Sequence, residues 1–270
     1  MSSKIGENVD LINELITASK EAAVIGGEIL KEHFRKVQSK DIEAKGVKDF
    51  VTYVDKLSEE RIKNYLLSIF PDHAFLGEEE GKSGNLDSEY VWVVDPLDGT
   101  KNYINGFDIF AVSVALMKND RPIAGSIYIP MLDKLYWAGE GQGSFLNGER
   151  INVSNRNSDY AVVATGFPFR YPEEVERYLK AFEQMMLTFS AVRRPGAAAV
   201  DLALTAEGVF DGFLEMKLSL WDVAAGILLI KEAGGKVTNF EGTDTIDGNV
   251  VAGNPEIYNQ LFDIVKKSLV

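Results

Sequence analysis

The chain has 270 residues, of which 41 are acidic and 28 are basic, giving a formal net charge of −13 at pH 7. This length is close to the upper limit for one hydrophobic core, so we expect one large domain or two closely packed halves. A surface this acidic repels a phosphate backbone, which argues against nucleic-acid binding. The absence of cysteine excludes disulfides and thiolate metal sites and is typical of a reducing cytoplasm.

No apolar run is long enough to cross a bilayer, and the first residues lack the basic-then-apolar pattern of a signal peptide. The sequence therefore predicts a cytoplasmic protein without a membrane-spanning segment.

The first quarter of the chain is predicted to be mainly helical. Apolar residues recur at helical spacing over residues 9–34, which indicates a long amphipathic helix. The polar, lysine-rich residues 36–49 are predicted to form a mobile loop. Thr52 and Asp55 have the spacing of a capping box, and a second helix is expected from there to Phe70, before Pro71.

The middle of the chain is predicted to be an antiparallel sheet. Apolar strand patterns cover residues 110–117, 122–129 and 134–138, with turn residues between them. Residues 139–148 end in Asn147-Gly148, a hairpin signal.

Beyond residue 158 the pattern is mixed. Strands are expected at 160–165, 210–216 and 249–252, and helices at 172–187, 197–205, 222–233 and from Pro255 onward. The change of pattern at 154–158 is the only candidate boundary, so we expect halves 1–153 and 154–270 within one compact unit.

One segment carries the strongest chemical signal. Val91–Val94 is predicted to be a buried strand, and Asp95, Asp98, Gly99 and Thr100 follow it. These residue types alone are also common in a plain turn. Two carboxylates at the end of a rigid strand, beside free backbone amides, are however the components of a metal-assisted phosphate site. Here the amides of Gly99 and Thr100 could hold a phosphate oxygen, and the Thr100 hydroxyl could orient a water molecule.

Two further acidic segments have both a structural and a functional interpretation. Glu78-Glu79-Glu80 is a solvated acidic loop or the end of a strand that delivers carboxylates to a site. Asp222, which follows Trp221, is a helix N-cap, a metal ligand, or both.

The remaining candidates have weaker patterns. Asp55 is explained by capping or by catalysis, and Lys45 is either solvent-exposed or able to swing over a bound phosphate. Glu215 could accept hydrogen bonds from substrate hydroxyls. His33 and His73, the only histidines, have no partner pattern and are predicted to be structural. A metal site built mainly from carboxylates and carbonyls favours Mg²⁺ or Mn²⁺ over Zn²⁺.

Taken together and in this order, the motifs resemble the inositol monophosphatase family of Mg²⁺-dependent, Li⁺-sensitive phosphatases. Residues 92–100 (WVVDPLDGT) match the family's first signature, and residues 221–235, from Trp-Asp to Gly-Gly, match the second. Residues 77–79 (GEE), 49–55 (DFVTYVD) and 193–199 (RRPGAAA) match further family segments. The resemblance covers nearly the whole chain. It implies a layered α-β-α-β-α sandwich of the inositol monophosphatase and fructose-1,6-bisphosphatase type.

The resemblance also implies a set of metal ligands. Glu78, Asp95 and the Leu97 carbonyl would hold a first Mg²⁺. Asp95, Asp98 and Asp222 would hold a second, and a third, weaker ion would lie near Glu78. Mn²⁺ is a conceivable substitute for Mg²⁺.

The other implied roles concern water and substrate. Thr100 and Glu78 would position and deprotonate the attacking water, with Thr52 and Asp55 supporting them. The amides of Gly99 and Thr100 would bind phosphate.

The substrate's hydroxyls would contact Asp98, Ala198 and Glu215, and Lys45 is a further candidate for the phosphate. Ala197 departs from the family pattern, which often has Ser or Thr there. Lys101 and residues 167–170 could shift specificity.

The leading hypothesis is an inositol monophosphatase, acting on a small phosphorylated polyol or sugar and forming a homodimer as family members commonly do. The first alternative is a fructose-1,6-bisphosphatase, solely or as a dual activity. An alternative from another class is a regulatory scaffold that binds a protein or RNA partner and has a vestigial site.

Overall fold

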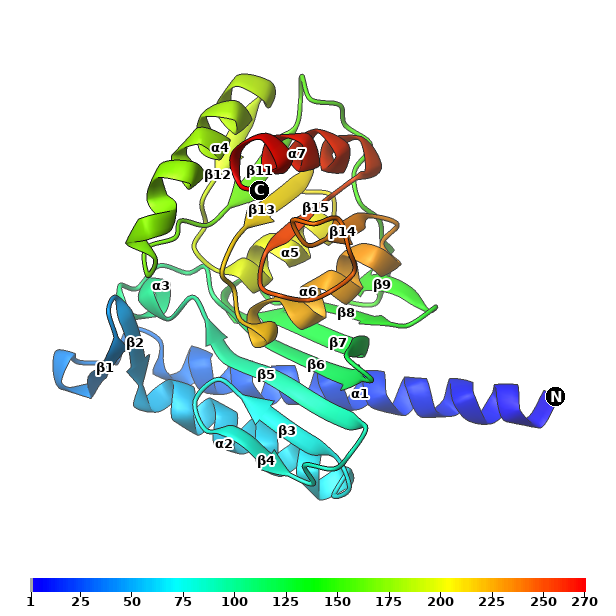
Figure 1. Ribbon diagram of the computed structural model, residues 1–270. Coiled ribbons are helices and arrows are strands. Elements are labelled where there is room, and N and C mark those ends of the chain that lie inside the picture. Colours follow the sequence, from blue (N-terminus) through cyan, green and yellow to red (C-terminus); the bar gives the residue numbers. More distant parts are fainter. Residues whose placement is uncertain (1) are drawn as a thin grey trace.

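The computed structural model describes residues 2–270, with side chains described from residue 11 onward. Two sheets are stacked with helices between them and on both outer faces (Figure 1). A small separate hairpin is formed by β1 (Ile42–Gly46) and β2 (Asp49–Thr52). None of the helices in this described part of the chain is long and apolar enough to cross a membrane.

The larger sheet has the strand order β10-β9-β8-β7-β6-β5-β3-β4. Its neighbours are antiparallel except for β3 and β5, which run parallel. The strands are β3 (Ala74–Gly77), β4 (Gly81–Gly84), β5 (Tyr90–Asp98), β6 (Ala111–Lys118), β7 (Arg121–Ile129), β8 (Lys134–Gly139), β9 (Gly143–Leu146) and β10 (Glu149–Ile151).

The smaller sheet has the order β12-β11-β13-β15-β14 and is mixed, because β11 is parallel to both β12 and β13 whereas β15 is antiparallel to β13 and β14. Its strands are β11 (Val162–Thr165), β12 (Ala191–Arg193), β13 (Gly212–Glu215), β14 (Lys236–Thr238) and β15 (Val250–Gly253).

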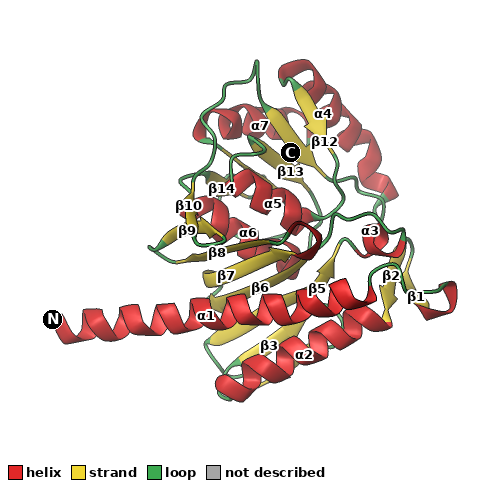
Figure 2. Ribbon diagram, turned by 180° about the vertical axis from the view of Figure 1, so that it is seen from behind, coloured by secondary structure: helices red, strands yellow, loops and turns green. Residues whose placement is uncertain are grey.

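Three helical layers bury the faces of these sheets. Figure 2 shows α1 (Ser2–His33) and α2 (Tyr53–Ile69) side by side across the outer face of the larger sheet. The helices α5 (Ala198–Ala206) and α6 (Leu220–Glu232) lie between the sheets, and α4 (Val175–Thr188) and α7 (Pro255–Ser268) cover the smaller one. Short helices complete the chain at α3 (Thr100–Ile104), η1 (Ser39–Asp41), η2 (Pro130–Leu132) and η3 (Pro172–Glu174). The predicted α-β-α-β-α sandwich is confirmed.

The expectation of an irregular loop over residues 36–49 is wrong. Part of this segment forms η1 and the β1–β2 hairpin, in which Ile42 pairs with Thr52 and Ala44 with Phe50. The four residues that follow Ile42 in β1 are exposed. Their sequence therefore lacks the apolar alternation by which a half-buried strand is recognised. The first helix also begins earlier than predicted, at Ser2 rather than Val9, because its start shows no apolar periodicity.

The strand predicted at Val91–Val94 is longer in the structure, where β5 continues to Asp98, and the other predicted elements agree to within about three residues. The turn at Asn147-Gly148 has positive φ at both residues, 49° and 91°, as a tight hairpin requires. The division into halves stays a prediction, since one buried apolar cluster joins β5–β8 from the first half with α5 and α6 from the second.

The close approach of α5 and α6 is expected to depend on Gly226. A methyl group there would lie 2.5 Å from Cβ of Leu202, which cannot move without its backbone. Gly226→Ala should lower the free energy of unfolding by up to about 2 kcal/mol, since overpacking costs about 1–3 kcal/mol and the higher helix propensity of alanine offsets about 1 kcal/mol of this cost. Chemical denaturation would measure this.

Gly46→Ala is the matched control, because its added methyl group would meet no atom closer than 3.9 Å. Equal stability of the two variants would contradict the proposed close packing of α5 against α6.

Candidate active site

Carboxylates from three separate parts of the chain converge on one pocket of about 430 Å³. Asp95 and Asp98 lie at the end of β5, Glu78 follows β3, and Asp222 lies in the first turn of α6. The regular pairing of β5 with β6 breaks between Asp95 and Asp98. This irregularity lets both carboxylates face the pocket rather than opposite sides of the sheet.

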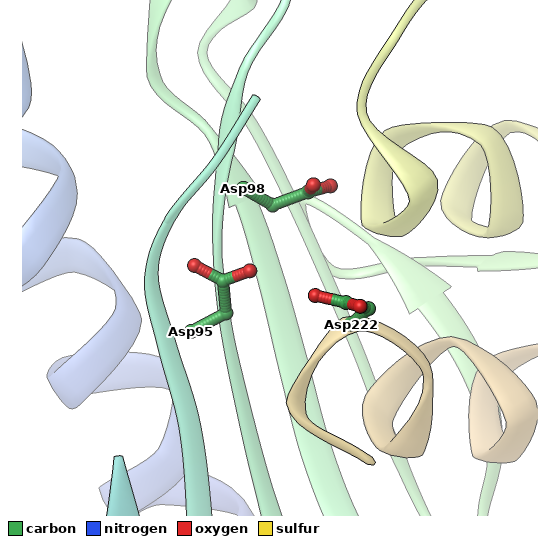
Figure 3. Close-up of side chains that lie close together, drawn as sticks. All are labelled: Asp95, Asp98 and Asp222. Atoms are coloured by element: carbon green, nitrogen blue, oxygen red, sulfur yellow. The ribbon is translucent and has the colours of Figure 1, made fainter. Parts of the chain in front are cut away.

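Asp95, Asp98 and Asp222 form the centre of the site. One oxygen from each lies within 4.8 Å of the others, and Figure 3 shows the three side chains pointing toward a shared space. Each carboxylate is fixed by a backbone amide of its surroundings: Leu97 N donates to Asp95 Oδ1 (2.9 Å), Ala199 N to Asp98 Oδ2 (2.7 Å) and Ser219 N to Asp222 Oδ2 (2.7 Å).

Three buried carboxylates this close repel one another. Burial and the neighbouring Asp222 raise the pKa of Asp98 to about 8, and burial and Glu78 raise the pKa of Asp222 to about 7. Burial, Glu78 and Asp98 raise the pKa of Asp95 well above its ordinary value. A cation between them would favour the charged forms, and an all-oxygen donor set suits Mg²⁺ or Mn²⁺.

Lys45 supports this interpretation of the charge. Its Nζ, reaching from β1, donates to Glu78 Oε1 at 2.7 Å and to Glu79 Oε1 at 2.8 Å. An ammonium group thus lies between two carboxylates at the edge of the site, which demonstrates that these side chains accept a shared positive charge. The predicted swing of Lys45 over a phosphate stays a prediction.

A hydroxyl–carboxyl network lies beside the metal-binding candidates. Thr100 Oγ1 donates to Leu97 O (3.1 Å) or to Asp55 Oδ1 (3.3 Å), and Asp55 Oδ2 accepts from both Oγ1 and N of Thr52. The capping box predicted at Thr52 and Asp55 is confirmed. Burial raises the pKa of Asp55 to about 7, which places it in the range of a group that accepts a proton near neutrality.

The structure brings nearly all of the predicted site residues to this pocket. Thr52 and Asp55 are not among the lining residues but are linked to Thr100 by hydrogen bonds. The ten that line the pocket are Lys45, Glu78, Asp95, Leu97, Asp98, Gly99, Thr100, Ala198, Glu215 and Asp222. The two histidines are elsewhere, His33 against Tyr53 and His73 stacked between Phe70 and Tyr90.

The comparison with protein families decides the relationship. The model described as "Inositol monophosphatase family" matches residues 11–269. The chain belongs to the inositol monophosphatase family. The resemblance seen in the sequence is therefore confirmed.

Individual relatives extend over almost the same length. A protein of Aquifex aeolicus named fructose-1,6-bisphosphatase/inositol-1-monophosphatase is 48% identical over 257 residues, covering 95% of this chain and 97% of the relative. Nus factor SuhB of Escherichia coli is 37% identical over 262 residues, covering 96% and 97%. The crystal structure of extragenic suppressor protein suhB from Bartonella henselae superposes with a TM-score of 0.90 at 39% identity, covering 95% and 100%.

Sequence reasoning missed Glu59, which supports the acidic loop of this family member. This fully buried side chain on α2 accepts hydrogen bonds from the amides of Glu79 (2.8 Å) and Glu80 (2.7 Å). Its carboxylate lies directly against Gly77, where a Cβ would be 2.3 Å from Glu59 Cδ. Glu59 follows Asp55 by four residues on α2, so helical spacing was a signal that could have identified it.

Sequence reasoning also missed a cluster of cations around Phe169, a residue that lines the pocket. The ring of Phe169 has Lys48 Nζ at 5.7 Å, Lys101 Nζ at 5.6 Å and Arg194 Cζ at 5.3 Å from its centroid, and Arg170 pairs with Asp49 at 2.7 Å. Burial, Arg170 and Arg194 lower the pKa of Lys101. Four segments distant in sequence supply these residues, so no local pattern in the sequence predicts the cluster.

The metal-free protein is expected to lose stability as the pH rises from about 4 to about 8. An unfolded carboxyl group titrates near pH 4, and the folded pKa values of Asp222 and Asp98 are about 7 and about 8. The folded state then binds more protons than the unfolded state, so the stability present below pH 4 is lost through this range. Mg²⁺ should oppose the loss, because it replaces the protons.

Thermal unfolding in chelator and in excess Mg²⁺, at matched ionic strength, would test this from pH 5 to pH 8. The difference between the two melting temperatures should widen with pH. A difference independent of pH would mean that the three aspartates are not the groups that bind the cation.

Proposed function

We propose that this protein is a Mg²⁺-dependent phosphomonoesterase that hydrolyses inositol monophosphate to inositol and phosphate. The observation that carries the proposal is the convergence of Asp95, Asp98 and Asp222 beside the Thr100–Asp55 hydrogen bond. Family membership supports the phosphatase chemistry, and the name of the Aquifex relative supports the substrate class.

The residues present fit the metal. Glu78, Asp95 and the carbonyl of Leu97 would hold one Mg²⁺, and Asp95, Asp98 and Asp222 a second, with a third, weaker ion near Glu78. Bound Mg²⁺ supplies a lowered pKa for the attacking water and neutralises charge on the leaving oxygen.

The chain's own residues would orient the water and receive its proton. Thr100 Oγ1 can accept a hydrogen bond from the water while donating its own proton toward Asp55 Oδ1, and Glu78 faces the same space. The two hydrogen bonds from Thr52 hold the Asp55 carboxyl in place. Asp55, with a pKa of about 7, can take up a proton at neutral pH.

Binding of the substrate would divide between two walls of the pocket. The amides of Gly99 and Thr100 would hold the phosphate, with Lys45 as a neighbouring cation. Asp98, Ala198 and Glu215 would contact the hydroxyls of the polyol. Glu215 is fixed for this role by Gly166, whose missing side chain leaves the room that the carboxylate fills.

A homodimer, sensitivity to Li⁺ and a cytoplasmic location are further parts of the proposal. They come from the family resemblance and from the absence of cysteine. The regulatory-scaffold alternative is disfavoured, because every carboxylate that the chemistry requires is present in the pocket.

The decisive assay is phosphate release from inositol 1-phosphate with and without Mg²⁺. Asp95→Asn should lower the Mg²⁺-dependent rate by about 100-fold or more, since Asp95 would contact both ions. Mutation of a residue that only hydrogen-bonds to a metal ligand already lowers metal affinity or activity by about 10–100-fold. Asp159→Asn, which changes an exposed aspartate away from the pocket, should leave the rate unchanged.

If the wild-type protein releases no phosphate from any monoester in Mg²⁺, the proposed function is wrong. The scaffold alternative would then be tested by isolating a stable protein or RNA partner.

A second activity, fructose-1,6-bisphosphate hydrolysis, is favoured by the cations around Phe169. Lys48, Lys101, Arg170 and Arg194 give a chain of net charge −13 a local positive edge. A monophosphate needs one anion-binding site, whereas a bisphosphate needs two. The cations around the partly exposed ring of Phe169 are suited to bind the second phosphate group. The Aquifex relative carries this activity in its name.

Lys101→Met should lower kcat/KM for fructose 1,6-bisphosphate about tenfold and that for inositol 1-phosphate by less than about threefold, because a charge-assisted hydrogen bond contributes about 1.5–3 kcal/mol. Lys82→Met, an exposed lysine outside the pocket lining, is the control. Equal losses on both substrates would place Lys101 at the shared phosphate and remove the argument for a second anion site.

A further inference from the structure

Asp201 is a buried carboxyl group in the pocket without a hydrogen-bond partner at one of its oxygens. It lies in the first turn of α5, is 1% exposed and belongs to the pocket lining. Its Oδ1 is fully buried and has no hydrogen-bond partner among the residues whose side chains the structure describes. A buried polar oxygen left unpaired costs about 1–3 kcal/mol, so such groups in native proteins call for a specific explanation.

The surroundings limit what the missing partner can be. Asp98 and Glu215 are near enough to raise the pKa of Asp201 well above its ordinary value, together with burial, which is the largest cause. A second anion would therefore be repelled. An apolar group would leave Oδ1 unpaired. Arg194, whose charge lowers the pKa of Asp201, lies over the rings of Phe167 and Phe169, at 5.5 Å and 5.3 Å from their centroids.

A neutral hydroxyl group satisfies all of these conditions. It donates one hydrogen bond and accepts others, so it can pair with a carboxyl group in either protonation state. Glu215, at the end of β13, faces the same pocket with its carboxyl group against Gly166. Two carboxyl groups from different elements thus flank the part of the pocket beyond Asp98.

We propose that Asp201 binds a hydroxyl group of the substrate's polyol portion, beside Glu215, and that it makes the pocket selective for a polyhydroxylated leaving group. The inference rests on the proposed phosphomonoesterase function and adds a specificity-determining residue to it. Asp201 does not act on the phosphate in this assignment, so its removal should affect substrates according to their hydroxyl groups.

The test compares two substrates, inositol 1-phosphate and 4-nitrophenyl phosphate, which has no hydroxyl group on its leaving portion. Asp201→Leu should raise KM for inositol 1-phosphate about tenfold and change kcat/KM for 4-nitrophenyl phosphate by less than about twofold, as expected when a buried hydrogen bond to a substrate hydroxyl is lost. Asp201→Asn keeps an acceptor and a donor and should restore most of the affinity.

Melting temperature provides a second readout. Asp201→Leu should not lower the melting temperature of the ligand-free protein, because it removes a buried oxygen that has no partner there. Thr205→Val is the matched control on α5, since the buried Thr205 hydroxyl bonds to Asp201 O and is not in the pocket lining. Any effect of this control should be equal for both substrates.

Parallel losses on the two substrates in Asp201→Leu would overturn the inference, because Asp201 would then act only by placing α5 and its Ala199 amide against Asp98. Unchanged kinetics on both substrates would overturn it as well. If the wild-type protein hydrolyses neither substrate, the proposed function itself fails. These results are distinct, since the first two require an active wild-type protein.

Discussion

The repulsion between buried carboxylates is the constraint on which the rest of this structure depends. Asp95, Asp98 and Asp222 are brought within hydrogen-bonding range of a common point, although each would be more stable apart from the others. The fold keeps them there because each carboxylate accepts a hydrogen bond from a backbone amide, either of its own turn or of a neighbouring helix. Carboxylates that repel one another and are rigidly held form a binding site for a cation, because the cation removes the repulsion.

The layered architecture supplies that rigidity. The sheet carries two of the three aspartates on β5, while α6 carries the third and α5 contributes the amide that holds Asp98. Because α5 and α6 are packed between the two sheets, movement of either helix would disturb an apolar core cluster as well as the site. Glycines permit this close assembly where a carboxylate occupies the space of a side chain, Glu59 against Gly77 and Glu215 against Gly166.

The sequence predicted most of this because the relevant signals are local. Asp95 and Asp98 follow an apolar strand pattern within a few residues, and Asp222 begins an apolar helix pattern. Both the residue types and their places at the ends of these elements could therefore be predicted. The hairpin β1–β2 was not, since β1 is largely exposed and lacks an apolar alternation. Contacts such as that of Lys45 with Glu78 join segments distant in sequence, and only the packing of the hairpin near the pocket creates them.

Charge is distributed in the pocket so that anion binding and cation binding are linked. Seven carboxylates line the pocket, and a phosphate group would be repelled from them unless positive charge is present. Lys48, Lys101 and Arg194 lie around Phe169 instead, and Lys45 bridges two glutamates. These cations can attract an anionic substrate but cannot neutralise Asp95, Asp98 and Asp222. The proposed function therefore includes a small, separate cation, and it leaves recognition of the organic part of the substrate to Glu215 and the other groups proposed to contact its hydroxyls.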